Sequence, residues 1–178
     1  MRMAIETDSK DWTWVLNEPC AECGFDADVT DPRSVAASVR ASIPAWITVL
    51  NRHDVRTRPN ETTWSPAEYA CHVSDVFAVF GGRLDLMLAE DDPLFANWDQ
   101  DEAARAEEYA AQVPVRIGPV LRVRGLHMAQ RIEAIPVDAW QRTGRRSNGS
   151  AFTVETLLQY FWHDVAHHLV DVGLADIG

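Results

Sequence analysis

Apolar residues recur at every third or fourth position in several long stretches of the chain, which is the period of amphipathic helices. The first such stretch covers residues 31 to 52, with Asp31 as a candidate N-cap and Pro32 at the first helical position. Pro44 lies inside this stretch. We therefore expect a helix there with a kink or a break at Pro44.

The second stretch has a well-marked start. Ser65-Pro66-Ala67-Glu68 has the spacing of a capping box, with proline at the first helical position. Trp64 and Tyr69 stand where the two residues of a hydrophobic staple belong. This predicts a helix from Ser65 to about residue 90, although the Gly81-Gly82 pair weakens its middle.

Three further helices complete the pattern. A short acidic helix is predicted over about 100 to 112, a long one over about 119 to 135, and the last from the N-cap Thr153 to about Gly173. No stretch shows the strict alternation that is typical of strands. The fold class predicted is all-α: a four-helix bundle with a short extra helix in the crossing connection.

The domain organisation predicted is an N-terminal arm over residues 1–30, followed by the bundle over residues 31–178. The arm contains Trp12 and Trp14. Two indole rings left in water would forgo a large apolar burial. We therefore expect the arm to lie against the bundle.

The charge of the chain narrows the classes of partner. The 178 residues carry a formal net charge of −11, with a pI near 4.8. Nucleic acids and anionic membranes both bind basic surfaces, so neither is expected as a partner. The sequence shows no basic segment followed by an apolar run at its start and no stretch near 18 apolar residues, so we expect a cytoplasmic protein. Lys10 is the single lysine among 16 basic residues, a bias that GC-rich codons or selection for arginine chemistry would produce.

The cysteines are Cys20, Cys23 and Cys71, too few for a disulfide framework. Cys20 and Cys23 have CxxC spacing, but the chain has no second such pair, which excludes a four-cysteine zinc site. A redox CxxC normally opens a helix in a βαβ unit, and no such pattern is present. We therefore interpret these two residues as unreactive thiols of the arm, and Cys71 as a core residue.

The strongest functional signal is the pair His163 and His167, four residues apart on the last predicted helix. Side chains at this spacing point the same way, so both imidazoles could bind one metal ion. His72 on the second helix could supply a third nitrogen and leave a coordination position open for water or substrate. The pair could also be two solvated histidines. His168 is rotated about 100° from His167, so we expect it to be exposed or to act only through a ligand.

Two other segments are candidates for roles in the site. Trp98, Asp99 and Asp101 lie in a connection at the mouth of the bundle, where an aromatic ring could bind substrate and a carboxylate could serve as general base. Asp99 is also an ordinary N-cap, which is the interpretation we favour for it. Arg145 and Arg146 belong to the one basic cluster and could bind a substrate carboxylate or phosphate, although pairing with nearby acids explains them equally well.

The segment from Trp64 to Asp75, with His72 near its end, and the later run His163-Asp164-Val165-Ala166-His167-His168 together resemble the DinB-like superfamily of DinB/YfiT-like metalloenzymes. The similarity covers about residues 31 to 173. It implies a four-helix bundle of the DinB/YfiT-like type whose divalent metal ion is held by His72, His163 and His167.

The resemblance implies a particular activity less specifically than it implies the fold and the metal ligands. One branch of the family looks like thiol S-transferases that use mycothiol or related thiols, so the resemblance implies a metal-dependent enzyme of this kind. In such an enzyme the metal ion keeps a small-molecule thiol ionised, and the thiolate attacks an electrophilic substrate. The alternatives are a metal-dependent hydrolase and a metal- or ligand-binding stress protein without turnover. Zinc is the expected metal, but imidazole ligands also suit nickel, iron and copper. Bundles of this type often pair, so a homodimer is expected.

Overall fold

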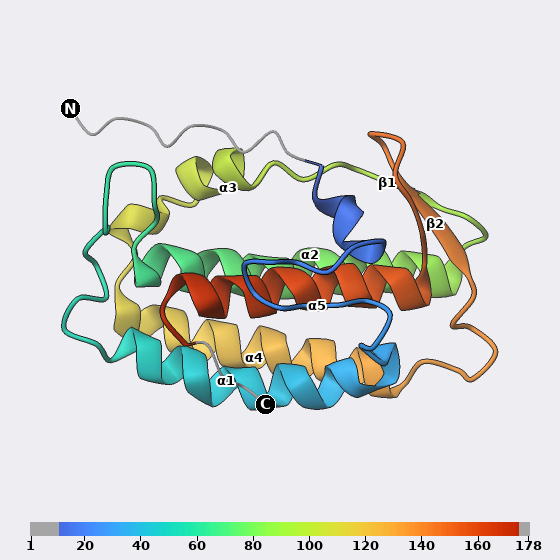
Figure 1. Ribbon diagram of the computed structural model, residues 1–178, viewed down its shortest axis with the longest axis horizontal. Helices are drawn as coiled ribbons and strands as arrows, with labels where there is room; N and C mark the ends of the chain where they lie inside the picture. Colours follow the sequence, from blue (N-terminus) through green and yellow to red (C-terminus); the bar gives the residue numbers. More distant parts are fainter. Residues whose placement is uncertain (1–10, 175–178) are drawn as a thin grey trace.

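The computed structural model describes residues 11–174, so the parts of the predicted arm and bundle that fall on residues 1–10 and 175–178 lie outside the described chain. Four long helices form the body of the molecule (Figure 1). They are α1 (Val35–Leu50), α2 (Pro66–Ala89), α4 (Pro114–Glu133) and α5 (Val154–Asp171). Helix α1 packs on α4, α4 on α2, and α2 on α5. The predicted four-helix bundle is confirmed, and the fold is mostly helical.

The core lies between these four helices because each turns its apolar stripe inwards. Large side chains from all four helices are fully buried there, among them Trp46, Phe77, Leu121 and Phe161. Gly118 and Gly125 of α4 let that helix approach α1, since a Cβ at either position would come within about 3.1 Å of Ile47 or Ile43.

The start of α2 follows the predicted capping box. The Ser65 hydroxyl accepts from the Glu68 backbone N–H at 3.4 Å, and the Ser65 backbone N–H donates to the Glu68 carboxylate at 2.9 Å. The Arg58 guanidinium donates to the same carboxylate. Burial opposes the ionisation of Glu68, but the hydrogen bonds from Arg58 and Ser65 outweigh it and hold the pKa of Glu68 below its usual value.

Other helix boundaries differ from the prediction. Helix α1 runs through Pro44 without a break, and α4 begins at Pro114, ahead of the predicted start, with Pro119 inside it. The acidic helix α3 (Gln100–Ala106) is shorter than predicted. It ends because Glu108 adopts a left-handed backbone conformation with φ of 49°, after which a separate 3-10 turn begins.

The structure adds a small three-stranded sheet that the pattern did not predict. Strand β1 (Leu94–Phe95) pairs in parallel with β2 (Thr143–Arg146), which pairs antiparallel with β3 (Ala151–Thr153). The sheet covers the end of α2. Gly144 is required there, because a Cβ would lie 2.6 Å from Cγ of Met87.

The N-terminal segment lies along α5 (Figure 1). Its described part contains a short 3-10 helix, Trp12–Leu16, and Val15 of this helix is fully buried against the bundle. The Gln159 side chain of α5 donates to two backbone carbonyls of the segment, at 2.8 and 2.9 Å. Trp12 is half-buried against the core, whereas Trp14 keeps 36% of its surface exposed. Of the two tryptophans of the arm, Trp12 is therefore the one that packs against the bundle.

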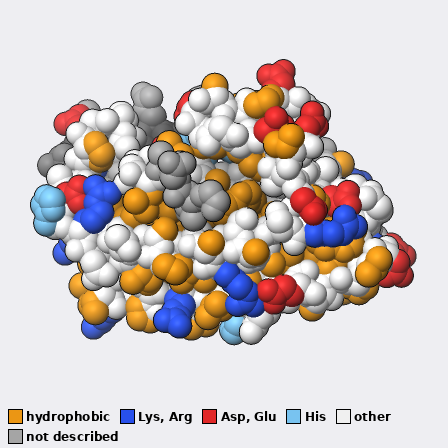
Figure 2. Space-filling view, turned by 60° about the horizontal axis from the view of Figure 1, so that its bottom comes forward, with side chains coloured by type: hydrophobic (Ala, Val, Ile, Leu, Met, Phe, Trp, Pro, Cys, Tyr) orange, Lys and Arg blue, Asp and Glu red, His pale blue; other side chains and the backbone are white. Residues whose placement is uncertain are grey.

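None of the helices in the described part of the chain is long and apolar enough to cross a membrane. Figure 2 turns forward the side on which α1 and α4 lie, and hydrophobic side chains are scattered there between basic and acidic ones. Val115 and Val123 of α4 are among the exposed apolar residues. The homodimer stays a prediction.

The packing of the arm can be tested at Val15. Replacing Val15 with Ala is expected to lower the free energy of unfolding by about 2 kcal/mol, because two buried methyl groups are lost at about 0.8 kcal/mol each and a small cavity remains. Urea titration followed by circular dichroism measures the change. Val29→Ala is the matched control, since Val29 is 80% exposed. Equal midpoints for Val15→Ala and the wild-type protein would show that the arm does not contribute to the fold.

The cap of α2 makes a prediction about pH. Glu68→Gln is expected to destabilise the protein by about 1 to 3 kcal/mol at pH 7, because a buried charge-assisted hydrogen bond is lost. The folded-state pKa of Glu68 is lowered, so its contribution is present above the unfolded-state pKa, declines as the pH falls below that value, and is lost below the folded-state pKa. Urea titrations of both proteins between pH 7 and acid should show the difference shrinking. A constant difference would contradict the ionised cap.

Candidate metal centre and pocket

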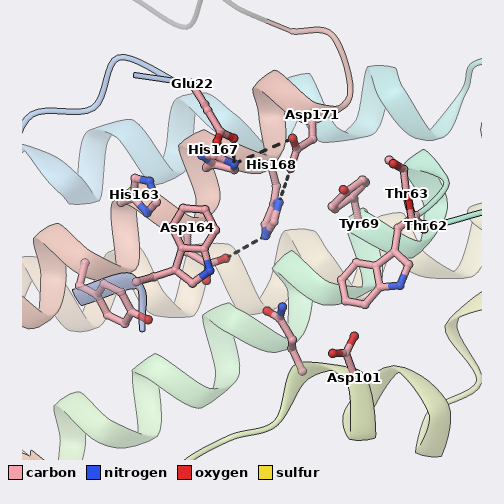
Figure 3. A pocket seen from close by; sticks show the side chains of 14 residues that line it. Glu22, Thr62, Thr63, Tyr69, Asp101, His163, Asp164, His167, His168 and Asp171 are labelled. Atoms are coloured by element: carbon pink, nitrogen blue, oxygen red, sulfur yellow. Dashed lines mark hydrogen bonds and ion pairs between the residues drawn. The ribbon is translucent and has the colours of Figure 1, made fainter. Parts of the chain in front are cut away.

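A cavity of about 490 Å³ opens beside α5 (Figure 3). Its wall comes from α5, the N-terminal arm, the segment before α2, the first turn of α2 and the start of α3. The side chains that line it are mainly aromatic, imidazole and carboxylate groups: Trp12, Glu22, Thr62, Thr63, Trp64, Tyr69, Gln100, Asp101, Tyr160, His163, Asp164, His167, His168 and Asp171. The pocket therefore gathers metal-ligand types from segments that are distant in the sequence.

Helix α5 presents two neighbouring stripes of polar side chains to its surroundings. His163 and His167 are four residues apart and turn towards the arm, where Cys20 and Cys23 lie. Asp164 and His168 repeat the same spacing one position later and turn towards α2. Each stripe meets a partner from another segment. The result is two groups of candidate ligands within one pocket region.

The first group consists of His72, Asp164 and His168, with one ligand atom of each lying within 4.8 Å of the others. Nε2 of His72 is 3.1 Å from Oδ1 of Asp164, and Nε2 of His168 is 3.5 Å from the same oxygen. Nδ1 of His168 lies 2.7 Å from Oδ2 of Asp171. A proton on this Nδ1 would be donated to Asp171, which leaves the lone pair of Nε2 directed towards Asp164 and His72.

The charge states of His72 and Asp164 suit metal binding. Burial lowers the pKa of His72, so its imidazole is neutral at pH 7. Burial opposes the ionisation of Asp164, but the neighbouring imidazoles, with His72 first among them, outweigh it and hold the pKa of Asp164 at about 2. Neutral imidazoles and an ionised carboxylate are the forms that ligate a divalent ion.

The geometry also fits one ion. Ligand atoms bonded at about 2.1 Å to a common metal lie about 3 to 3.5 Å apart, which matches the two distances to Asp164. His72 is fully buried, and its Nδ1 has no hydrogen-bond partner. The indole of Trp98 stacks on the His72 ring, with centroids 5.4 Å apart and planes inclined by 13°. The predicted substrate-binding residue Trp98 thus covers a candidate ligand.

The second group consists of Cys20, Cys23, His163 and His167, again with ligand atoms within 4.8 Å of one another. Sγ of Cys20 is 3.7 Å from Nδ1 of His167. Burial raises the pKa of Cys23 to about 11, so this thiol is protonated at pH 7 unless a cation binds it. Burial, aided by the neighbouring His167, lowers the pKa of His163 to about 4.

The structure therefore places the three predicted metal ligands in two groups. His163 and His167 lie together, while His72 lies with Asp164 and His168. His168, expected to be exposed or to act through a ligand, has the position of a ligand itself. Sequence reasoning missed Asp164 and His168, although their spacing is the same as that of His163 and His167. One site formed by His72, His163 and His167 stays a prediction.

The two predicted general-base candidates have different environments. The Asp99 carboxylate accepts from the backbone N–H groups of Asp101 and Glu102, at 2.9 and 2.8 Å, so it caps α3 as we favoured. Asp101 is buried and lines the pocket opposite the α5 side chains (Figure 3). Of the two, Asp101 is the carboxylate within reach of a bound substrate.

The predicted substrate-binding arginines have other partners. Arg145 is exposed, and its Nε lies 2.8 Å from the carboxylate of Asp92. Arg146 is buried and donates to Asn148 and Ser150 at 2.8 and 2.9 Å, within the turn between β2 and β3. Neither residue lines the pocket. Their role as substrate-binding residues stays a prediction, and their contacts are those of a structural loop.

Fold and site together define a helical-bundle protein whose last helix borders a pocket rich in histidine and carboxylate groups. A model of the DinB superfamily matches residues 36–171, which is more than half of the chain. The protein belongs to the DinB superfamily.

Two relatives are similar over most of their length. The chain is 27% identical over 118 residues to a protein of Halalkalibacterium halodurans named "Putative metal-dependent hydrolase", an alignment that covers 65% of this chain and 67% of the relative. The structure of YfiT from Bacillus subtilis, described as "a probable metal-dependent hydrolase with an unusual four-helix bundle topology", matches with a TM-score of 0.67 and 16% identity. That match covers 80% of this chain and 85% of YfiT, and it establishes the fold. Both names describe hydrolases, and the S-transferase expected from the sequence stays a prediction.

The two arginines make a matched pair for testing the loop. Arg146→Ala is expected to destabilise the protein by about 2 kcal/mol, because a buried guanidinium loses its hydrogen bonds and its packing. Arg145→Ala should change the stability by less than about 1 kcal/mol, since its ion pair with Asp92 is exposed. Thermal unfolding measures both, and metal content should be unchanged in each variant. A large loss of bound metal in either variant would contradict the structural role.

Proposed function

We propose that this protein is a metal-dependent hydrolase whose divalent ion is held by His72, Asp164 and His168. The observation that carries the proposal is the convergence of two imidazoles and an ionised carboxylate at the wall of a large pocket. The membership of the DinB superfamily and the names of the two relatives support the same class of reaction.

Two histidines and one carboxylate are a ligand set that leaves coordination positions open. A divalent ion bound in such a site would promote hydrolysis in two ways. It would lower the pKa of a bound water molecule, and it would polarise the bond to be cleaved. Zinc fits this donor set, and iron and nickel fit it as well.

The residues of the chain have separate tasks around that ion. Asp171 orients the imidazole of His168 through Nδ1, as carboxylates commonly do for metal-binding histidines. Asp101, on the opposite wall, is the base proposed to take a proton from the attacking water. Trp98 shields His72 from solvent, which keeps that imidazole neutral.

The charge of the pocket indicates the class of substrate. Glu22, Asp101, Asp164 and Asp171 line it, and its lining residues include no lysine or arginine. A divalent ion bound by Asp164 offsets two of these four charges, and the wall keeps a net negative charge. A neutral or cationic ester or amide therefore suits the wall better than a thiol cofactor that carries carboxylates. The mycothiol-type S-transferase stays a separate prediction.

The test combines metal analysis with assays on a panel of neutral and cationic esters and amides. His168→Gln and Asp164→Asn are expected to lose one equivalent of metal and to lower kcat/KM by about 100-fold or more. Asp101→Asn should keep the metal and lower kcat by about 100-fold, the usual contribution of a general base. His127→Gln is the matched control, since His127 is exposed on α4 and should leave both unchanged.

Three results would contradict the proposal. One is loss of metal and activity in His163→Gln with neither lost in His168→Gln, which would favour the site formed by His72, His163 and His167. Another is turnover of electrophiles by added thiols without hydrolysis of the panel, which would favour the S-transferase. The third is metal binding without turnover in either assay, which would favour a binding protein.

A further inference from the structure

The group formed by Cys20, Cys23, His163 and His167 shares no residue with the proposed catalytic metal site, and it has a different set of ligand types. Its two thiols come from the arm and its two imidazoles from α5. The spacings are C-x2-C and H-x3-H. Both occur in closed zinc sites with two cysteine and two histidine ligands.

The arm is shaped to present both thiols on one side. The Gly24 backbone N–H donates to the Cys20 carbonyl at 2.8 Å, and the Cys20 N–H donates to the Phe25 carbonyl at 2.8 Å. These bonds close a tight turn around the two cysteines. Gly24 has φ of +75°, a conformation that favours glycine, and it directly follows Cys23. Both thiols are free.

The imidazoles are placed to complete the set. A tetrahedral zinc ion with bonds of about 2.3 Å to sulfur and about 2.1 Å to nitrogen holds these atoms about 3.6 Å apart. Sγ of Cys20 and Nδ1 of His167 are 3.7 Å apart. The other nitrogen of His167 lies 3.4 Å from the carboxylate of Glu22, which could hold its proton as carboxylates do beside metal-bound histidines.

His163 gives independent support for a ligand. It keeps only 3% of its surface exposed, and its buried Nε2 has no hydrogen-bond partner. An unpartnered polar atom in the interior is costly, and a metal ion would remove that cost. The rings of Phe25 and Trp12 pack on His163, with centroids 5.3 and 5.8 Å away, and they shield this imidazole from water.

We propose that Cys20, Cys23, His163 and His167 form a closed, structural zinc site that fastens the N-terminal arm to α5. Four protein ligands leave no position for substrate, so this ion does not take part in hydrolysis. On binding, the two thiols release their protons to solvent and form two S–Zn bonds, and no oxidant or reductant is required.

Metal stoichiometry and cobalt spectroscopy test the site in the full-length protein. Wild-type protein with reduced thiols is expected to bind two equivalents of zinc, and its cobalt form to show a sulfur-to-cobalt charge-transfer band. The double variant Cys20→Ser, Cys23→Ser should bind one equivalent and lose the band. Cys71→Ser is the matched control, because the third cysteine lies on α2 outside the group, and it should keep both.

A second variant separates this site from the catalytic one. His168→Gln should lose one equivalent and keep the sulfur-to-cobalt band, so the two proposals can fail independently. Chelation of the metal should lower the unfolding temperature of the wild-type protein more than that of the double cysteine variant.

Wild-type protein also gives a test that does not depend on the folding of any variant. Cobalt titrated into the metal-free chain should develop the charge-transfer band as protons are released. A wild-type cobalt form without this band would overturn the proposal. So would a Cys20–Cys23 disulfide in protein purified without oxygen, because oxidised sulfurs cannot serve as thiolate ligands.

Discussion

The structure depends on the burial of imidazole and carboxylate groups along both sides of one helix. Helix α5 packs in the core through its apolar stripe, and its two polar stripes border that core. Polar groups in such a place must have partners, because water is excluded from them. On one side the partner is His72 of α2, and on the other it is the arm. The apolar core holds the helices together, and this requirement adds to it by setting which side chains of α2 and of the arm meet the polar stripes of α5.

Local interactions fix the position of His72 before any ligand is considered. Glu68 completes the capping box of α2 and is held by Arg58, and His72 follows one helical turn later. The cap therefore sets where α2 begins and which way His72 points. The residues directly before this cap, Thr62, Thr63 and Trp64, belong to the pocket wall. The buried carboxylate of Glu68 and its ion pair with Arg58 thus help to shape the site.

The sequence predicted the bundle and the capped starts of α2 and α5, because helical periodicity and caps are local signals. It did not predict the sheet, since β1 has two residues and β2 has four, too few to show alternation. It identified the region of the site but not the grouping of its ligands. His163 with His167 and Asp164 with His168 have identical spacing, and only the packing of α5 determines which pair faces α2. The partnership of the arm cysteines with α5 is equally non-local.

The family model matches residues 36–171, whereas Trp12 and Glu22 of the pocket wall lie before that range. The side chains proposed for catalysis and part of the surface that a substrate would touch therefore belong to different stretches of the chain. Substitutions confined to the arm could alter selectivity while the helices and their core stay as they are. Relatives that share this bundle therefore need not accept the same substrates, because part of the pocket wall lies outside the region that the family model matches.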